Sequence, residues 1–340
     1  MKILLDIGHP GHVLFYRNAI SQLTKRGHQV LVTARDKEVV FQLLKAYGIP
    51  YLNRGGAYTG LLRKALGMLK IDAYMLKTAL KFKPDVLTGI HNPYIAHSAF
   101  LMGKPSVIFT DTEHARIANL LTFPFATRIC TPNWFKKDLG VKHVRYDGFK
   151  ELAYLSPKYF KPDINVIDRM DVGKNEKYAV VRLVSWKAAH DVNQRGILNP
   201  ARLIKKLEAN YRVFLSSESP IPREFEKYKL KTNPEELQSV LYYASMQVGE
   251  GSTTATEAGL LGTPSVYIST LVGTMGNFEE LRKLQLVYSY KTIEEAEPKI
   301  NELIEDADSK KKWAARSMEV TLQKADVADF IAKQIESYGR

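Results

Sequence analysis

The chain contains Gly249-Glu250-Gly251-Ser252-Thr253-Thr254-Ala255-Thr256-Glu257-Ala258-Gly259-Leu260-Leu261-Gly262-Thr263-Pro264-Ser265-Val266, which has the pattern of a strand end, a turn of small residues, a helix and a second strand. A turn without bulky side chains lets backbone N–H groups reach an anion, and the helix dipole favours negative charge at the same place. Ser252, Thr253 and Thr254 add hydroxyl donors where the helix starts. The segment therefore predicts an α/β sheet that binds the diphosphate of a nucleotide.

Glu257 lies about one turn into this predicted helix. A carboxylate there is placed to accept hydrogen bonds from both hydroxyls of a ribose, as acidic residues do in other nucleotide-binding folds. The alternative is an ordinary exposed glutamate in the first turn. The neighbouring glycines and hydroxyl residues favour ribose binding.

Strand and helix patterns alternate along the chain, which is typical of a parallel sheet covered on both faces. Strand patterns cover residues 2–7, 29–33, 85–88, 106–109 and 128–131, with helical patterns at 13–25 and 37–47. After a proline-bearing connection at 155–162, strand patterns resume at 178–183, 212–215, 247–248 and 265–268, and the last segment, 310–338, is helical. We expect two Rossmann-like domains facing across a cleft, residues 1–154 and 155–340, with the last helix able to cross back to the first domain.

The length of 340 residues fits two domains, and the 45% hydrophobic content is that of a soluble globular protein. The first residues lack the pattern of a secretory signal peptide, and no apolar run approaches the roughly 20 residues of a membrane span. A single cysteine, Cys130, excludes an internal disulfide and is expected to be a packed strand residue. These features predict a cytoplasmic protein.

Positive charge is concentrated in the first half of the chain. Residues 1–150 hold 22 Lys and Arg against 9 Asp and Glu, whereas residues 151–340 hold 27 of each. This asymmetry predicts an anionic partner for the first domain. Residues 54–83 form a basic amphipathic stretch, which predicts either a solvated core helix or contact with the inner face of the membrane.

Ligands bind outside the carboxyl ends of parallel strands, so the residues after each predicted strand are the candidate site. In the first domain these include His12, Asp111 and Glu113. Each also has an ordinary interpretation, because His12 with His9 could cap the first helix, and the two acids suit the start of the next one.

The residues Gly8, Gly11 and His12, the basic first domain and the segment 249–264 together resemble the GT-B fold. Within it, the chain is similar to the peptidoglycan N-acetylglucosaminyltransferase that acts on lipid-linked muramyl peptide and to the non-hydrolysing UDP-N-acetylglucosamine 2-epimerases. It most resembles a family of archaeal and bacterial proteins of about this length described as a domain of unknown function. The likeness covers nearly the whole chain.

The resemblance assigns expected roles in the second domain. It implies ribose binding by Glu257, and diphosphate contacts from the helix start. It also implies phosphate and uracil contacts after the first strand of that domain, and donor-sugar contacts after the strand at 265–268. The residues concerned are Gly251, Ser252, Thr253 and Thr254 at the helix start, Arg182 and Ser185 after that first strand, and Gly276 and Asn277 after residues 265–268.

The chain departs from the epimerases at the acidic positions on which those enzymes rely. The matching positions hold Asn92, Asp111, Arg116 and Arg182, so a single acid remains and epimerisation is disfavoured. A shift of a few residues in the alignment would restore Glu113.

The sequence thus predicts a GT-B glycosyltransferase that moves a sugar from a nucleotide diphosphate, with UDP as the expected carrier, to a lipid-linked or other anionic acceptor. His12, Asp111 or Glu113 is expected to remove the acceptor proton, and Arg182 with the helix start to stabilise the leaving diphosphate. No cofactor and no metal is expected. The alternatives are a 2-epimerase and a nucleic-acid-binding protein, the latter disfavoured because no binding motif is present.

Overall fold

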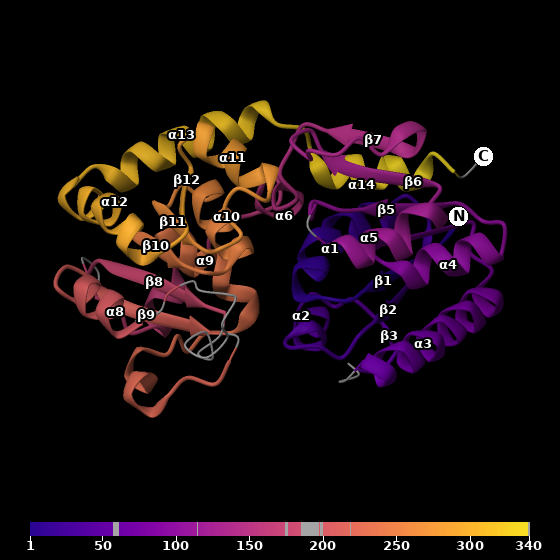
Figure 1. Cartoon of the computed structure of the whole chain (residues 1–340), viewed down its shortest axis with the longest axis horizontal. Helices are drawn as coiled ribbons and strands as arrows, with labels where there is room; N and C mark the ends of the chain where they lie inside the picture. The colour runs from indigo at the N-terminus through magenta and orange to yellow at the C-terminus, as the bar shows by residue number, and fades with distance from the viewer. Residues whose placement is uncertain are drawn as a thin grey trace. The chain divides into compact units, whose positions relative to one another are not determined.

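The computed structural model describes residues 1–56, 61–113, 115–173, 176–184, 197, 200–217 and 219–338, with only the backbone for 61–65. The chain forms two compact units (Figure 1). Unit 1 comprises Met1–Tyr159 and Ala325–Arg340, and unit 2 comprises Phe160–Lys324. Relative to the expected division at residue 154, the boundary lies five residues later, and the C-terminal helix belongs to unit 1.

Unit 1 contains a parallel sheet in the order β3-β2-β1-β4-β5-β6-β7. Its strands are β1 (Lys2–Ile7), β2 (Gln29–Ala34), β3 (Leu52–Asn53), β4 (Val86–Ile90), β5 (Ser106–Phe109), β6 (Arg128–Pro132) and β7 (His143–Tyr146). Its helices are α1 (Pro10–Lys25), α2 (Val40–Ala46), α3 (Leu61–Phe82), α4 (Pro93–Leu101), α5 (Arg116–Thr122), α6 (Leu152–Leu155) and α14 (Val327–Glu336).

Unit 2 contains a second parallel sheet, in the order β12-β11-β10-β8-β9. Its strands are β8 (Tyr178–Leu183), β9 (Arg212–Ser217), β10 (Met246–Gly249), β11 (Ser265–Ile268) and β12 (Val287–Tyr290). Its helices are α7 (Asn165–Arg169), α8 (Pro200–Glu208), α9 (Leu237–Tyr243), α10 (Ser252–Leu260), α11 (Gly276–Lys283), α12 (Ile293–Glu305) and α13 (Ser309–Gln323). The predicted architecture of two parallel α/β sheets is therefore confirmed.

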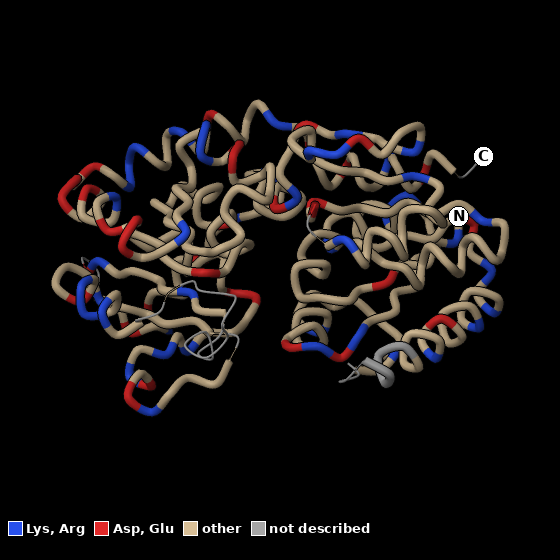
Figure 2. Tube along the Cα trace, in the orientation of Figure 1, with Lys and Arg blue, Asp and Glu red and all other residues tan. Residues whose placement is uncertain are grey.

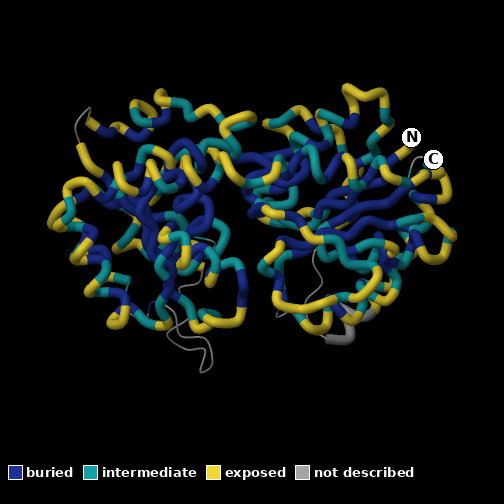
Figure 3. The backbone as a smooth tube through the Cα atoms, turned by 90° about the horizontal axis from the view of Figure 1, so that it is seen from above, coloured by how far each residue is buried: buried dark blue, intermediate teal, exposed yellow. Residues whose placement is uncertain are grey.

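The central strands read as apolar runs because helices cover both faces of each sheet. Strand β1 is buried from Ile3 to Ile7, and β8 pairs with both β10 and β9 in parallel register. Figure 3 shows the buried residues gathered in the interior of each unit. Cys130 is a buried residue of β6, as expected.

Sequence and structure differ over the segment 310–338, which the sequence predicts as one helix. The structure has two helices there, α13 and α14, because the chain leaves helical geometry at Lys324 and restarts at Asp326. The Asp326 side chain caps α14 by accepting from the N–H of Asp329. Breaking the helix at this point returns the chain to unit 1.

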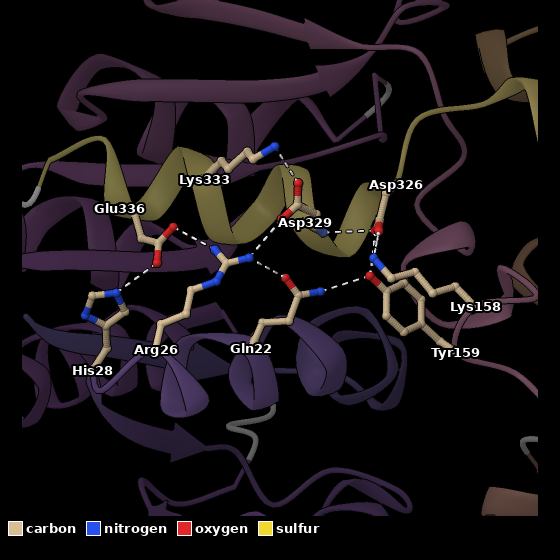
Figure 4. Close-up of polar contacts among 9 residues, drawn as sticks. All are labelled: Gln22, Arg26, His28, Lys158, Tyr159, Asp326, Asp329, Lys333 and Glu336. Atoms are coloured by element: carbon tan, nitrogen blue, oxygen red, sulfur yellow. Dashed lines mark hydrogen bonds and ion pairs between the residues drawn. The ribbon is translucent and has the colours of Figure 1, made fainter.

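Helix α14 packs along α1, and a polar network ties the two together (Figure 4). The Arg26 guanidinium donates to Asp329 at 2.9 Å and to Glu336 at 2.7 Å. The Tyr159 hydroxyl donates to Asp326 at 2.7 Å. Buried Val327, Ala328, Ile331, Ala332 and Ile335 supply the apolar face of α14. The C-terminal segment thus completes unit 1.

Positive charge remains concentrated in unit 1 after this division. Unit 1 holds 25 Lys and Arg against 13 Asp and Glu, while unit 2 holds 24 against 23. Figure 2 shows Lys and Arg spaced along α3. No helix within the described residues is long and apolar enough to cross a membrane.

Candidate functional site

The turn between β10 and α10 is built around two glycines that face Arg182. A Cβ on Gly249 would overlap the backbone carbonyl of Arg182 on the neighbouring strand β8. A Cβ on Gly251 would lie 2.7 Å from Cγ of Arg182. Only glycine lets the chain pass this close, and the consequence is that the Arg182 side chain lies against the start of α10.

Helix α10 begins with hydrogen-bond donors available to a ligand. Gly251 is the N-cap and has no side chain with which to accept from the first turn. The N–H groups of a first turn have no acceptor within the helix, so Ser252, Thr253 and Thr254 present theirs at the positive end of the helix dipole. Ser252 and Thr253 are half-buried, whereas Thr254 is buried. This arrangement is a general anion-binding geometry.

Arg182 adds a cation beside this helix start. Its Nη1 donates to the hydroxyl of Ser216 on β9 at 2.7 Å. Its backbone carbonyl accepts from the N–H of Glu250 at 2.8 Å. The bond to β9 holds the guanidinium at the carboxyl edge of the sheet, and its role as a phosphate contact stays a prediction.

Glu250 accepts hydrogen bonds from two described residues that follow β8. Its carboxylate accepts from the N–H of Val184 at 3.1 Å and from the N–H of Ile197 at 2.8 Å. These two residues flank positions 185–196 in the sequence. Ser185, a predicted uracil contact, lies outside the described residues.

Glu257 is buried, with 2% of its surface exposed, and its Oε1 accepts from the Gln238 amide at 3.1 Å. The alternative that it is an exposed first-turn glutamate is therefore wrong. Gln238 comes from α9, whose packing against α10 brings the two side chains together. The bond to Gln238 and the burial fix the orientation of the Glu257 carboxylate.

The predicted donor-sugar contacts lie at another helix start. Gly276 and Asn277 are the first two residues of α11, after Met275 as N-cap. The Oδ1 atom of Asn277 is buried and has no hydrogen-bond partner among the described residues. It therefore has acceptor capacity available for a ligand hydroxyl.

In unit 1, a buried carboxylate organises the carboxyl edge of the sheet. Asp6 on β1 is fully buried, and its Oδ1 accepts from Arg54 Nε and from the hydroxyl of Thr33, both at 2.6 Å. Its Oδ2 accepts from the Asn92 amide at 2.5 Å. Asn92 also caps α4 through the N–H of Ile95. Asn92, which the resemblance aligns with an acid of the epimerases, is thus committed to structural hydrogen bonds.

The two histidines after β1 have different roles. His9 caps α1 by accepting from the N–H of Gly11 at 3.2 Å, so the capping interpretation is confirmed for His9. His12 Nδ1 accepts from the N–H of Gly8 at 3.3 Å. Burial, together with the positive charges of His9, Lys150 and Lys37, lowers the pKa of His12 well below its ordinary value. His12 is therefore neutral near pH 7, with its proton on Nε2.

The two acids after β5 occupy different environments. Asp111 lies 2.7 Å from the ammonium of Lys150; burial alone would raise the pKa of Asp111, but the ion pair outweighs it and the pKa is lowered. Glu113 is 6% exposed and accepts from the N–H of Lys136 at 3.3 Å. Neither caps α5, whose N-cap is Ala115 without a side-chain hydrogen bond.

One Asp-x-Asp sequence, Asp306-Ala307-Asp308, lies between α12 and α13. Paired carboxylates of this kind can bind a divalent cation. Here the Asp306 carboxylate instead accepts from Lys312 at 2.6 Å and from the N–H of Asp308. The two aspartates therefore stabilise the connection between α12 and α13.

Sequence reasoning missed four residues of these clusters: Asp6, Arg54, Lys150 and Gln238. Asp6 carried a readable signal, because an acid inside an apolar strand is rarely buried without a specific partner. The sequence places Arg54 in the basic stretch 54–83, but in the structure Arg54 lies before α3 and is buried against Asp6. Lys150 and Gln238 gave no signal, since each meets its partner only through the tertiary fold.

Solved structures of two kinds of enzyme share this fold. The UDP-GlcNAc 2-epimerase of Neisseria meningitidis bound to UDP-GlcNAc superposes with a TM-score of 0.69 over 99% of this chain and 100% of that chain, at 13% identity. The Streptomyces sp. SF2575 glycosyltransferase SsfS6 gives a TM-score of 0.60 over 99% of each chain, at 14% identity. The predicted GT-B fold is confirmed by these likenesses.

The sequence comparisons give the family. An uncharacterised protein of Methanocaldococcus jannaschii is 24% identical over 287 residues, which cover 80% of this chain and 84% of that protein. A family model described as a protein of unknown function, DUF354, matches residues 1–323. Because that match spans nearly the whole chain, the protein belongs to the DUF354 family.

Proposed function

We propose that the protein is a metal-independent glycosyltransferase that moves a sugar from a nucleotide-diphosphate donor, expected to be a UDP-sugar, to a lipid-linked or other anionic acceptor. The observation that carries the proposal is the start of α10, where donors of the first turn lie beside Arg182 and the same helix buries Glu257. Proteins of the same fold that bind UDP-GlcNAc or transfer sugars support this assignment.

In this proposal the donor diphosphate binds at Ser252–Thr254, and Arg182 neutralises charge as the diphosphate leaves. Fixed donors aimed at developing negative charge need no metal to stabilise it. Glu257 holds the ribose, Ser185 contacts the base, and Gly276 with Asn277 contacts the donor sugar. A guanidinium that forks onto phosphate oxygens is the appropriate group for this task.

The acceptor binds unit 1, where three residues are candidates to remove its proton. His12 is disfavoured as a base because the Gly8 N–H occupies its Nδ1 lone pair, which leaves a proton on Nε2. Asp111 is disfavoured because the lowered pKa of an ion-paired carboxylate makes it a weak base near neutral pH. We therefore assign the base to Glu113 and give His12 the role of a hydrogen-bond donor.

We further propose that unit 1 contacts the surface of an anionic membrane. Helix α3 buries Ile71, Met75 and Ala79, which is the expected core helix, yet its outer side also exposes apolar and basic residues. Exposed apolar side chains continue on the neighbouring helices α4 and α5. These residues, the α3–α5 face, are Leu66, Leu69, Leu80, Phe100, Leu101, Ile117 and Leu120, with exposed Lys70, Lys77 and Lys81 among them. Mixed leucine and lysine faces bind anionic lipid surfaces.

A 2-epimerase is the second candidate, favoured by the better superposition on the epimerase than on the glycosyltransferase and by buried Glu113. The two enzymes differ in a measurable way. An epimerase would incorporate solvent deuterium into UDP-N-acetylglucosamine without any acceptor, whereas a transferase would not.

The proposal is tested by thermal shift with UDP, ADP, GDP and a panel of UDP-sugars. A ligand that binds only the folded state raises the melting temperature, so UDP and one UDP-sugar should stabilise the wild type. Arg182→Ala should lose that stabilisation, whereas Arg17→Ala, a substitution in unit 1, should keep it. If no nucleotide stabilises the wild type, the proposed donor site is wrong.

A further inference from the structure

Arg54 is a buried cation whose hydrogen-bonding capacity is only partly used. Its side chain is 3% exposed, and Nε donates to Asp6 at 2.6 Å. The guanidinium also lies 5.2 Å from the ring of Tyr94. Its terminal nitrogens, Nη1 and Nη2, donate to no residue that the structure describes. The Nη atoms are not among the fully buried atoms that lack a partner, so this edge of an otherwise buried guanidinium reaches the surface, where its donors can bind a ligand.

The Asp6 network fixes Arg54 from one side. Both carboxylate oxygens of Asp6 are engaged, Oδ1 by Arg54 and Thr33 and Oδ2 by Asn92. The one bond from Arg54 to Asp6 uses Nε, and no terminal nitrogen of Arg54 bonds to Asp6. The network orients the guanidinium and leaves its Nη edge for another acceptor.

The Nη edge borders the glycine-containing loop after β1. A Cβ on Gly8 would lie 3.5 Å from Arg54 Nη2 and 3.9 Å from Cε1 of His12. Gly8 thus keeps side-chain atoms out of the space that these two groups share. His12 carries its proton on Nε2, since Nδ1 accepts from Gly8. Arginine and histidine together offer N–H donors around this space.

We infer that Arg54 and His12 form a binding site for one anionic group, a carboxylate or a phosphoryl group, of the molecule that binds unit 1. The planar fork of arginine matches two oxygens of either group. The identification of that molecule as the glycosyl acceptor rests on the proposed function. The anion site itself depends only on residues of unit 1, and not on the proposed function.

The experiment follows the His12 ring by ¹⁵N NMR in the full-length protein, with the signal assigned from its loss in His12→Asn. Inorganic phosphate and glucuronate are titrated separately, so that the phosphoryl and carboxylate sources are distinguished. A saturable shift of the His12 signal with either probe is expected. Arg54→Lys keeps a cation beside Asp6 but loses the fork, and should weaken binding by at least roughly tenfold.

Two further samples keep the test decisive. Arg17→Lys is the matched control, because Arg17 also stacks on an aromatic ring of unit 1 but lies away from Asp6; its affinity should equal that of the wild type. If Arg54→Lys does not fold, the double variant Asp6→Asn with Arg54→Gln removes both buried charges together and should also lose binding. The inference is overturned if neither probe moves the His12 signal, or if the Arg54 variants bind as tightly as the wild type.

A UDP titration of the same samples separates the two proposals. If the wild type binds UDP but neither anion moves its His12 signal, this site is overturned and the donor site is left standing. Anion binding at His12 without any UDP binding supports this site and contradicts the proposed function.

Discussion

Gly251 lies so close to Arg182 that a Cβ at this position would come within 2.7 Å of the arginine Cγ. Gly251→Ala should therefore displace the guanidinium from the start of α10 and weaken UDP binding by roughly tenfold, about 1.4 kcal/mol. Calorimetric titration measures the change. In an Arg182→Ala background the same substitution should have no further effect, and an additive loss would show that Gly251 acts independently of Arg182.

Glu257→Gln tests the ribose contact while keeping the shape of a buried side chain. The wild type should bind UDP more tightly than 2′-deoxy-UDP by roughly 1.5–3 kcal/mol, the range for hydrogen bonds to charged groups. The variant should lose most of that preference. Glu113→Gln, which changes a buried glutamate in unit 1, is the control and should preserve it. Equal discrimination by Glu257→Gln and the wild type would remove Glu257 from the ribose site.

The lowered pKa of His12 predicts a stability change at acid pH. Above about pH 6.5 the ring is neutral in both the folded and unfolded states, so it contributes no pH dependence. As the pH falls below that value, the unfolded state binds a proton that the folded state resists, and folding stability decreases. His12→Asn retains an acceptor for the Gly8 N–H and should flatten the profile between pH 6.5 and 5. If the free energy of unfolding of His12→Asn and of the wild type falls by the same amount between pH 6.5 and 5, the prediction is contradicted.

Lys310 gives a second pH dependence, in unit 2. Its ammonium donates to the carbonyl of Tyr242 at 2.5 Å and to the hydroxyl of Thr263, and burial lowers the pKa of Lys310 to about 7. Below pH 7 Lys310 is protonated in both the folded and the unfolded state, so burying its charge lowers the folding stability by the full amount. Stability is regained as the pH rises from about 7 towards the unfolded pKa of about 10.4.

Lys310→Met should remove this rise in the free energy of unfolding. The stability of the variant relative to the wild type should therefore be lower at pH 9.5 than at pH 7. Chemical denaturation at both values measures the difference. Lys311→Met, at the exposed neighbouring position, should show the same pH dependence as the wild type. A pH-independent difference between Lys310→Met and the wild type would mean that the folded lysine titrates normally.

The α3–α5 face predicts salt-dependent binding to anionic vesicles. Exchanging Lys70, Lys77 and Lys81 for Glu should abolish vesicle flotation at low salt. The attraction between exposed charges and the vesicle is strongest there, because near physiological ionic strength it reaches only about 8–10 Å. UDP binding should stay unchanged. The matched control reverses the exposed Lys205, Lys283 and Lys311 of unit 2 and should float like the wild type. Equal loss in both triple variants would indicate non-specific charge attraction.

The sequence predicts the central strands well, because buried parallel strands are apolar along their whole length. The bounds of β1, β5, β8 and β11 agree with the sequence patterns residue for residue. The strands that the sequence missed lie towards the sheet edges: β3 has two residues, and β7 and β12 have four each. The strand β3 is too short for a pattern, whereas β7 and β12 are only partly buried and mix polar with apolar residues, unlike the equally short but fully buried β5 and β11.

The site is predicted less evenly, for a physical reason. Glu257 and Arg182 are local to a readable motif, whereas Asp6 and Arg54 are 48 residues apart and meet only because β1, β2 and β3 are neighbours. The role of His12 depends on which ring nitrogen the Gly8 N–H occupies, which no residue pattern encodes. Motifs identify residue types; the network of partners decides what each can do.

The return of α14 to α1 has a consequence for biosynthesis. The first 159 residues leave the ribosome long before the segment that covers the Arg26 side of α1, because all of unit 2 is translated in between. Domains generally fold in the order in which they are made. Here the nascent N-terminal unit must wait, with one flank of α1 uncovered, until residues 325–340 emerge. A stop codon between unit 2 and the end of α14 would thus damage the part of the protein that was made first.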